Sequence, residues 1–140
     1  QVFKRGVRIM KALEFLNKAR VYYLATVDEN NQAHVRPLGF VMEYNGKLTF
    51  CTSNQKDMFK QLIFNPKVEL CCIDQNLNTL RILGEAVFVT SKETQAKALE
   101  IMPSLGQMYS VGDGKFEIFS IDKAKVSCCS MSGKKIDVEL

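Results

Sequence analysis

The segment His34-Val-Arg-Pro-Leu-Gly-Phe40, together with Leu48-Thr-Phe-Cys-Thr-Ser-Asn-Gln-Lys56, indicates both the fold and the candidate site. The first run is β-like and interrupted by Pro37, and the second is a strand that ends in small hydroxyl and amide residues, with a lysine just beyond. Backbone and hydroxyl donors at a strand end, beside a helix start and a lysine, suit a phosphate group. Arg36 lies upstream in a neighbouring strand, so the pattern predicts a phosphorylated cofactor on a β scaffold.

Length and composition predict a single globular domain over residues 1–140. Apolar residues make up 46% of the chain and charged residues 24%, as in ordinary soluble proteins. The net charge of +4 is mild, and the chain contains no run of basic residues, so we expect no nucleic-acid partner. No apolar run is long enough to span a bilayer and no secretory signal is visible, so we expect a cytoplasmic protein without membrane contact.

The five cysteines favour a reducing compartment. Their number is odd, two pairs are adjacent, and no C-x-x-C spacing occurs, which leaves no metal-binding pattern. We interpret each of them as a small buried hydrophobic residue rather than a reactive thiol. They are Cys51, Cys71, Cys72, Cys128 and Cys129.

Hydrophobic periodicity in the first half predicts a helix followed by three strands. Apolar residues recur at helical spacing from Val7 to Leu16, which predicts an amphipathic opening helix. The dipeptide Asn45-Gly46 lies between two β-like runs and predicts a tight hairpin, because both central positions need positive φ. The expected strands cover residues 21–27, 33–43 and 47–52, with Pro37 marking an edge or a bulge in the second.

The second half predicts two helices and four strands. A short helix is expected over about 55–64, with Ser53 or Asn54 as its N-cap and Asn65-Pro66 as its end. The spacing Thr90-Ser-Lys-Glu93 is that of a capping box and predicts a helix over about 91–102. The expected strands cover 68–74, 79–89, 116–122 and 125–131, with Gly84 as a bend. The fold class predicted is therefore mainly β (α+β), an antiparallel β-barrel of six to seven strands with peripheral helices, and the resemblance described below implies that this barrel is split.

Two cations are candidates for binding an anion, and each has a plainer interpretation. Lys56 is expected in the first turn of the short helix, where the dipole opposes a cation unless a phosphate is bound; otherwise it is a solvated lysine. Arg36 could bind a phosphate with paired donors, or face solvent from its strand. His34 is the only histidine and lacks partners for a metal site, so we interpret it as a surface or structural residue.

The chain resembles the FMN-binding split-barrel proteins related to pyridoxamine 5′-phosphate oxidase, and among them the Nim-type (nitroimidazole-resistance) reductases and the general-stress flavoproteins. The resemblance spans nearly the whole chain in the right order. It is carried by Tyr23-Leu-Ala-Thr-Val27, Val35-Arg-Pro-Leu-Gly39, Gly46-Lys-Leu-Thr-Phe-Cys-Thr52, Lys56, Lys60-Gln-Leu62, Asn65-Pro-Lys-Val68, Gly84-Glu-Ala-Val-Phe88 and Met108-Tyr109.

This resemblance implies a homodimer with two FMN molecules at the subunit interface. It implies that the segment from Val35 to Leu38 runs along the flavin ring, that Thr79 or Arg81 reaches the cofactor from the partner subunit, and that the loop at Met108-Tyr109 covers the ring. Several relatives carry tryptophan where Thr79 stands, so the contacts of those relatives with the ring or substrate do not carry over to this position. The fuller set of basic and aromatic residues that the vitamin B6 oxidases use for pyridoxamine phosphate is missing from this chain, so pyridoxamine phosphate oxidation is not predicted. The cofactor-binding residues implied are Val35, Arg36, Pro37, Leu38, Phe50, Cys51, Thr52, Ser53, Asn54, Lys56, Thr79 and Arg81, and no catalytic acid or base is indicated.

The function expected from the resemblance is electron or hydride transfer between a small-molecule donor and a small acceptor, with FMN as the redox group. A nitroaromatic acceptor is implied by the resemblance alone. Three further functions are compatible with the sequence. They are a flavin carrier or sensor without turnover, a haem or deazaflavin binder on the same barrel, and an oligonucleotide-binding barrel, against which the modest charge argues.

Overall fold

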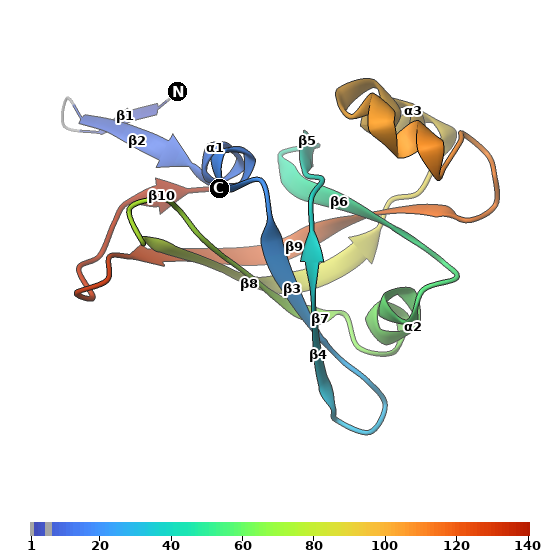
Figure 1. Cartoon of the computed structure of the whole chain (residues 1–140), viewed down its shortest axis with the longest axis horizontal. Coiled ribbons are helices and arrows are strands. Elements are labelled where there is room, and N and C mark those ends of the chain that lie inside the picture. The colour runs from blue at the N-terminus through green and yellow to red at the C-terminus, as the bar shows by residue number, and fades with distance from the viewer. Residues whose placement is uncertain (1, 5–6) are drawn as a thin grey trace.

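The computed structural model describes residues 2–4 and 7–140, with side chains described from residue 9 onward. Its centre is a seven-stranded antiparallel sheet that curls around an apolar core, with α-helices at its periphery (Figure 1). This confirms the predicted mainly β class and antiparallel barrel. The strands are β3 (Tyr22–Val27), β4 (Ala33–Leu38), β5 (Met42–Tyr44), β6 (Lys47–Ser53), β7 (Lys67–Ile73), β8 (Thr79–Phe88) and β9 (Phe116–Cys129).

The strand order leaves the barrel split. It runs β4-β3-β7-β8-β9-β6-β5, so β4 and β5 form the two edges although they follow one another in the chain. The helix α2 (Asp57–Phe64) follows β6 and packs against both β3 and β6 beside this opening (Figure 1). Pro37 lies in the edge strand β4, as predicted. This strand pairs only with β3 in the sheet, so the missing N–H of Pro37 costs no hydrogen bond to a strand on its other side.

The predicted opening helix begins later than expected. The helix α1 covers Ala12–Ala19, whereas Val7–Lys11 forms the strand β2. This strand pairs antiparallel with β1 (Val2–Lys4) and parallel with β10 (Val138–Glu139) in a small second sheet. The helical spacing from Val7 was misleading, because the partner strand β10 lies at the far end of the chain and leaves no local signal.

The strand predicted over residues 33–43 is two strands. β4 ends at Leu38 and β5 begins at Met42, because the chain crosses from one edge of the sheet to the other through Gly39. The hairpin at Asn45-Gly46 is confirmed, with φ values of 49° and 75° at its two central residues. This turn sets the register in which Tyr44 faces Lys47.

The last two predicted strands are one continuous strand, β9, which pairs along both β6 and β8. The predicted break falls at Lys123, whose φ of 52° marks an irregularity rather than an end. The register of β8 against β9 shifts between Leu83 and Glu85, so the predicted bend at Gly84 is confirmed. The long strand carries the sheet around the barrel.

Both predicted helix starts are displaced. The N-cap of α2 is Lys56, not Ser53 or Asn54, because a turn closed by the Lys56 N–H and the Ser53 carbonyl (3.0 Å) precedes the helix. The helix α3 (Lys92–Ile101) is capped by Ser91, whose Oγ accepts from the Thr94 N–H at 3.0 Å. The capping box is therefore one residue later than the predicted Thr90-to-Glu93 box. After α3, the chain forms a short 3-10 helix, η1 (Pro103–Gln107).

The core has two parts. The barrel interior is filled by side chains from all around the sheet, with the ring of Phe50 stacked on that of Phe119 at 5.6 Å. A second cluster lies on the other side of β6 and β9, under α3 and η1, around Phe116 and Tyr109. In the described part of the chain, none of the helices has both the length and the apolar character that a membrane span requires.

Candidate functional site

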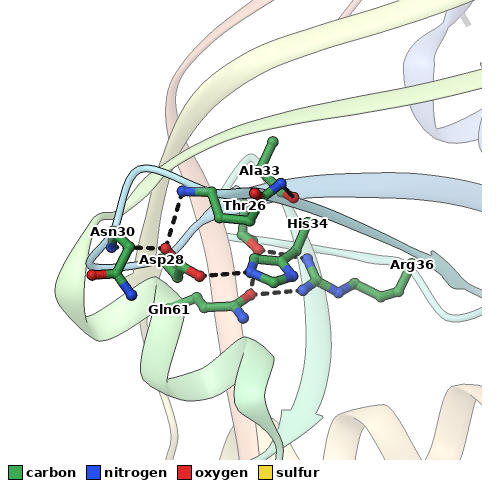
Figure 2. A network of polar contacts seen from close by, with 8 residues as sticks. Thr26, Asp28, Asn30, Ala33, His34, Arg36 and Gln61 are labelled. Carbon is green, nitrogen blue, oxygen red and sulfur yellow. Dashed lines mark hydrogen bonds and ion pairs between the residues drawn. The ribbon is translucent and has the colours of Figure 1, made fainter.

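Arg36 is held on the inner face of β4, against residues of β3 and α2. β3 and β4 pair so that Arg36 faces Leu24, which places its side chain on the same face of the sheet as buried Leu24. The guanidinium Nη1 donates to the Leu24 carbonyl at 3.2 Å and to the Thr26 hydroxyl at 2.7 Å. Its Nη2 donates to the Gln61 side-chain oxygen at 2.7 Å (Figure 2). Three bonds thus fix the orientation of the guanidinium.

Gln61 completes a closed ring of contacts with Arg36. The Thr26 hydroxyl donates to Gln61 Oε1 at 2.6 Å while it accepts from Arg36 (Figure 2). Thr26 is 1% exposed and Gln61 8% exposed, so the ring is shielded from water. Neither residue was predicted from the sequence. A signal existed for Gln61, since it shares the buried side of α2 with Met58 and Leu62, where an amide needs a polar partner.

The acceptors of Arg36 are all uncharged oxygens. The Arg36 side chain is half-buried, and this partial loss of hydration lowers the pKa of its guanidinium. A carbonyl, a hydroxyl and an amide hold the positive charge in place but do not neutralise it. Such a group is suited to binding an anion at its remaining donors.

A second pair lies beside this network. His34, two residues before Arg36 on the same face of β4, is bonded through Nε2 to Asp28 Oδ2 at 2.9 Å. Asp28 Oδ1 also accepts from the Asn30 and Gln32 N–H groups at 2.8 and 3.0 Å. The hydrogen bond from His34, and to a smaller extent the one from Gln32, hold the pKa of the Asp28 carboxyl below its ordinary value. The half-buried His34 therefore orders the β3–β4 turn, as expected of a structural residue.

A cavity of about 310 Å³ separates this turn from α2, with His34 and Gln61 among its lining residues. Within the described part of the chain, no group of three or more metal-binding side chains comes together. The cavity is also lined by the carboxylates of Asp28, Glu29 and Asp57 and by Lys60, so charged groups of both signs border it beside Gln61.

The middle residues of β6 face alternate sides. Phe50 is completely buried in the barrel core, where its ring stacks on that of Phe119, so only its backbone is available to a ligand in this structure. Cys51 points to the second cluster. Burial raises the pKa of the Cys51 thiol to about 11, with nearby Lys56 acting in the opposite direction, so the thiol is protonated at neutral pH.

Thr52 has an unmet hydrogen-bonding requirement. It is 1% exposed, and in the described part of the chain its hydroxyl has no partner. A buried hydroxyl without a partner costs about 1–3 kcal/mol, so a bound group that pairs with it would be favoured. Thr52 lies where β6 leads to Lys56 and α2, and this donor set suits a phosphate monoester.

The next two residues of this stretch have local partners. Ser53 Oγ accepts from the Gln55 N–H at 3.2 Å, and Asn54 Nδ2 donates to Glu117 Oε2 at 3.0 Å and to the Gly114 carbonyl at 2.8 Å. Asn54 therefore ties the strand end to the start of β9. Lys56 is exposed at the N-cap of α2.

The remaining predicted site residues lie elsewhere. On β4, Val35 and Pro37 are exposed on the outer side, whereas Leu38 is half-buried on the inner side. Arg81 is exposed on β8, where it forms an ion pair with Glu69. Thr79 lies on the same outer side, at the start of β8. One chain alone therefore does not bring Thr79 and Arg81 to Arg36.

The predicted lid at Met108-Tyr109 is partly used for packing. Met108 is exposed, but the ring of Tyr109 stacks on Phe116 at 4.5 Å. Burial raises the pKa of the Tyr109 hydroxyl.

The barrel is split between its edge strands β4 and β5, and Arg36 lies on the edge strand β4 with hydroxyl and amide partners from β3 and α2. The model of the family described as pyridoxamine 5′-phosphate oxidase matches residues 10–127. This chain belongs to that family, in which flavin binding is common.

Solved structures agree with this assignment. A NimC/NimA family protein from Clostridium acetobutylicum is 44% identical, with 89% of this chain and 86% of that chain covered and a TM-score of 0.83. A pyridoxamine 5′-phosphate oxidase-related, FMN-binding protein from Nostoc punctiforme is 18% identical over 86% and 79% of the two chains, with a TM-score of 0.62. A haem-binding protein from Mycobacterium smegmatis is 13% identical over 87% and 57%, with a TM-score of 0.70. The comparison with curated proteins gave no significant match.

Proposed function

We propose that this protein binds FMN between the subunits of a homodimer and transfers electrons from a small-molecule donor to a small acceptor. Arg36, Thr52 and Lys56 would hold the phosphate, and the exposed edge of β4 from Val35 to Leu38 would lie along the ring. FMN, when bound, supplies one- and two-electron redox chemistry. The chain's own residues bind and orient the cofactor and shield one side of it.

The observation that carries the proposal is the state of Arg36. Its guanidinium is partly buried, and its three acceptors are neutral oxygens. A buried charge without a counter-ion is costly, and an incoming phosphate dianion would remove that cost. The unpartnered hydroxyl of Thr52 adds a second group that a phosphate ester would satisfy.

The homodimer is supported by the outer face of the sheet, defined here as the outward side of β4, β3, β7 and β8. Val35 is 68% exposed and Tyr23 is 47% exposed on this face, and Ile73 and Leu83 are also exposed there. Tyr23 lies between Pro37 and Cys71 in the register, so these three residues form a short apolar row, which ends at Arg81 and its ion-pair partner Glu69. Clustered apolar residues on a folded surface mark an interaction site, and a second copy would cover them.

Reduction of a nitroaromatic acceptor is the finer part of the proposal. It is supported by the Nim-type resemblance and by the 44% identity to a NimC/NimA family protein. The candidate site offers Arg36 as a fixed cation and the half-buried His34 as a polar neighbour, and we assign neither the role of an acid or base.

The test is to purify the protein, record its visible spectrum, and identify by mass spectrometry the small molecule released on denaturation. We expect a flavin spectrum and FMN, or stoichiometric uptake of added FMN by colourless protein. Oxidation of NADH or NADPH with a panel of acceptors then tests turnover. Tight FMN binding without turnover by any donor would support a carrier or sensor instead.

The visible spectrum also distinguishes FMN from a haem or a deazaflavin in the same barrel. Haem gives an intense Soret band and a deazaflavin gives a shifted flavin-like spectrum. Protein that is colourless and takes up no flavin would overturn the proposal.

A further inference from the structure

The guanidinium of Arg36 is occupied on one edge and available on another. An arginine has five N–H donors in a fixed plane. Two of them, both on Nη1, bond to the Leu24 carbonyl and the Thr26 hydroxyl, and one on Nη2 bonds to Gln61 Oε1. The Nε–H and the second Nη2–H have no partner in the described part of the chain. These two form the edge that binds an oxyanion through two parallel bonds.

Thr26 and Gln61 act as one acceptor. Their oxygens lie 2.6 Å apart and are bonded to each other. Arg36 therefore donates to the Thr26 and Gln61 oxygens through Nη1 and Nη2, at the end of its guanidinium. Because the guanidinium is planar, the edge formed by Nε–H and the second Nη2–H faces away from these two oxygens. Neither residue competes with an anion for this edge.

We infer that Gln61, supported by Thr26, is a positioning residue that sets the preference of the site for a phosphorylated flavin over the unphosphorylated one. The inference rests on the proposed function. Gln61 does so in two ways: its oxygen fixes the guanidinium, and its lack of charge leaves the positive charge of Arg36 available to the phosphate. A glutamate at this position would pair with Arg36 and neutralise it.

The test compares FMN with riboflavin, which shares the ring but lacks the phosphate. Gln61→Glu keeps the size of the side chain and places a carboxylate where Oε1 lies 2.7 Å from Nη2. We expect its Kd for FMN to rise about tenfold or more, the range expected for loss of a charge-assisted contact, and its Kd for riboflavin to change less than about threefold. Gln75→Glu, which adds the same charge in the exposed β7–β8 turn, should leave both constants unchanged.

A second variant keeps the test decisive if Gln61→Glu folds poorly. Gln61→Met removes the acceptor without adding charge, and we expect a smaller loss, again confined to FMN. Equal loss of both flavins, or no loss of either, would overturn the inference, because a merely structural residue does not distinguish the ligands. Failure of the wild-type protein to bind FMN would instead overturn the proposed function on which the inference rests.

Discussion

Gly84 lies directly against Ile121. A Cβ atom on Gly84 would come 2.2 Å from the Cγ2 atom of Ile121 and 2.8 Å from the backbone oxygen of Asp122. The two strands β8 and β9 approach each other this closely at the register shift, so the bend of the sheet depends on the absence of a side chain.

Gly84→Ala should therefore destabilise the fold. We expect a loss of about 1–3 kcal/mol in the free energy of unfolding, because a backbone oxygen cannot move aside as a flexible side chain can. Urea denaturation measures the change. Gly106→Ala is the matched control, since nothing lies within 4 Å of the position of its Cβ. Equal stability of the two variants would contradict the close approach.

The bond between Asp28 and His34 predicts a dependence of stability on pH. The pKa of the Asp28 carboxyl is lower in the folded protein, so at acidic pH the unfolded chain binds the proton more readily. The stabilisation is complete above the ordinary aspartate pKa of about 4 and is lost as the pH falls through the lowered folded value. Asp28→Asn should therefore cost stability at pH 7, and this cost should shrink at pH 3.

Urea denaturation of wild-type and Asp28→Asn protein at both pH values checks this. Asp137→Asn, which removes a carboxylate in the C-terminal segment, serves as the control. A difference between wild type and Asp28→Asn that stays the same at pH 7 and pH 3 would show that the carboxyl is not stabilised in its charged form.

The sequence predicted those elements whose cause is local. The Asn45-Gly46 turn and the end of α2 at Asn65 depend on residues within a few positions, and both are confirmed. The β2 strand was missed because its partner β10 lies about the length of the chain away, so tertiary pairing overrode helical spacing. The same holds for the long strand β9, which an irregularity at Lys123 divides in sequence but not in space.

In the candidate site too, the residue with a local signal was predicted and its tertiary partners were missed. Arg36 was identified because a cation in a β-like run is conspicuous, and its placement on an edge strand was predicted from Pro37. The partners Thr26 and Gln61 were missed because threonine is ordinary in a strand and glutamine is ordinary in a helix. Their importance comes from the contact between β3 and α2, which only the folded chain defines.

Lys56 provides a direct test of the phosphate assignment. Lys56→Ala should weaken FMN binding by about 1–3 kcal/mol, because a charge-assisted contact at the N-terminus of α2 is lost. Riboflavin binding should not change. Titration of flavin fluorescence gives both constants, and Lys134→Ala, which removes an exposed lysine from the C-terminal turn, is the control. An unchanged FMN constant would remove Lys56 from the site.

The proposed dimer depends on Tyr23 at the centre of the outer face. Tyr23→Lys places a charge in an apolar row, so it should cost the dimer much of its stability while leaving the barrel folded, because the side chain is 47% exposed in the single chain. Sedimentation velocity should show a dimer for wild type and a lower mass for the variant, and FMN uptake should fall with it. Ile63→Lys, at a residue that is 61% exposed on α2 outside this face, should remain dimeric. A wild-type monomer that binds FMN at full strength would show that one chain holds the cofactor without a partner, and the outer face would then need another explanation.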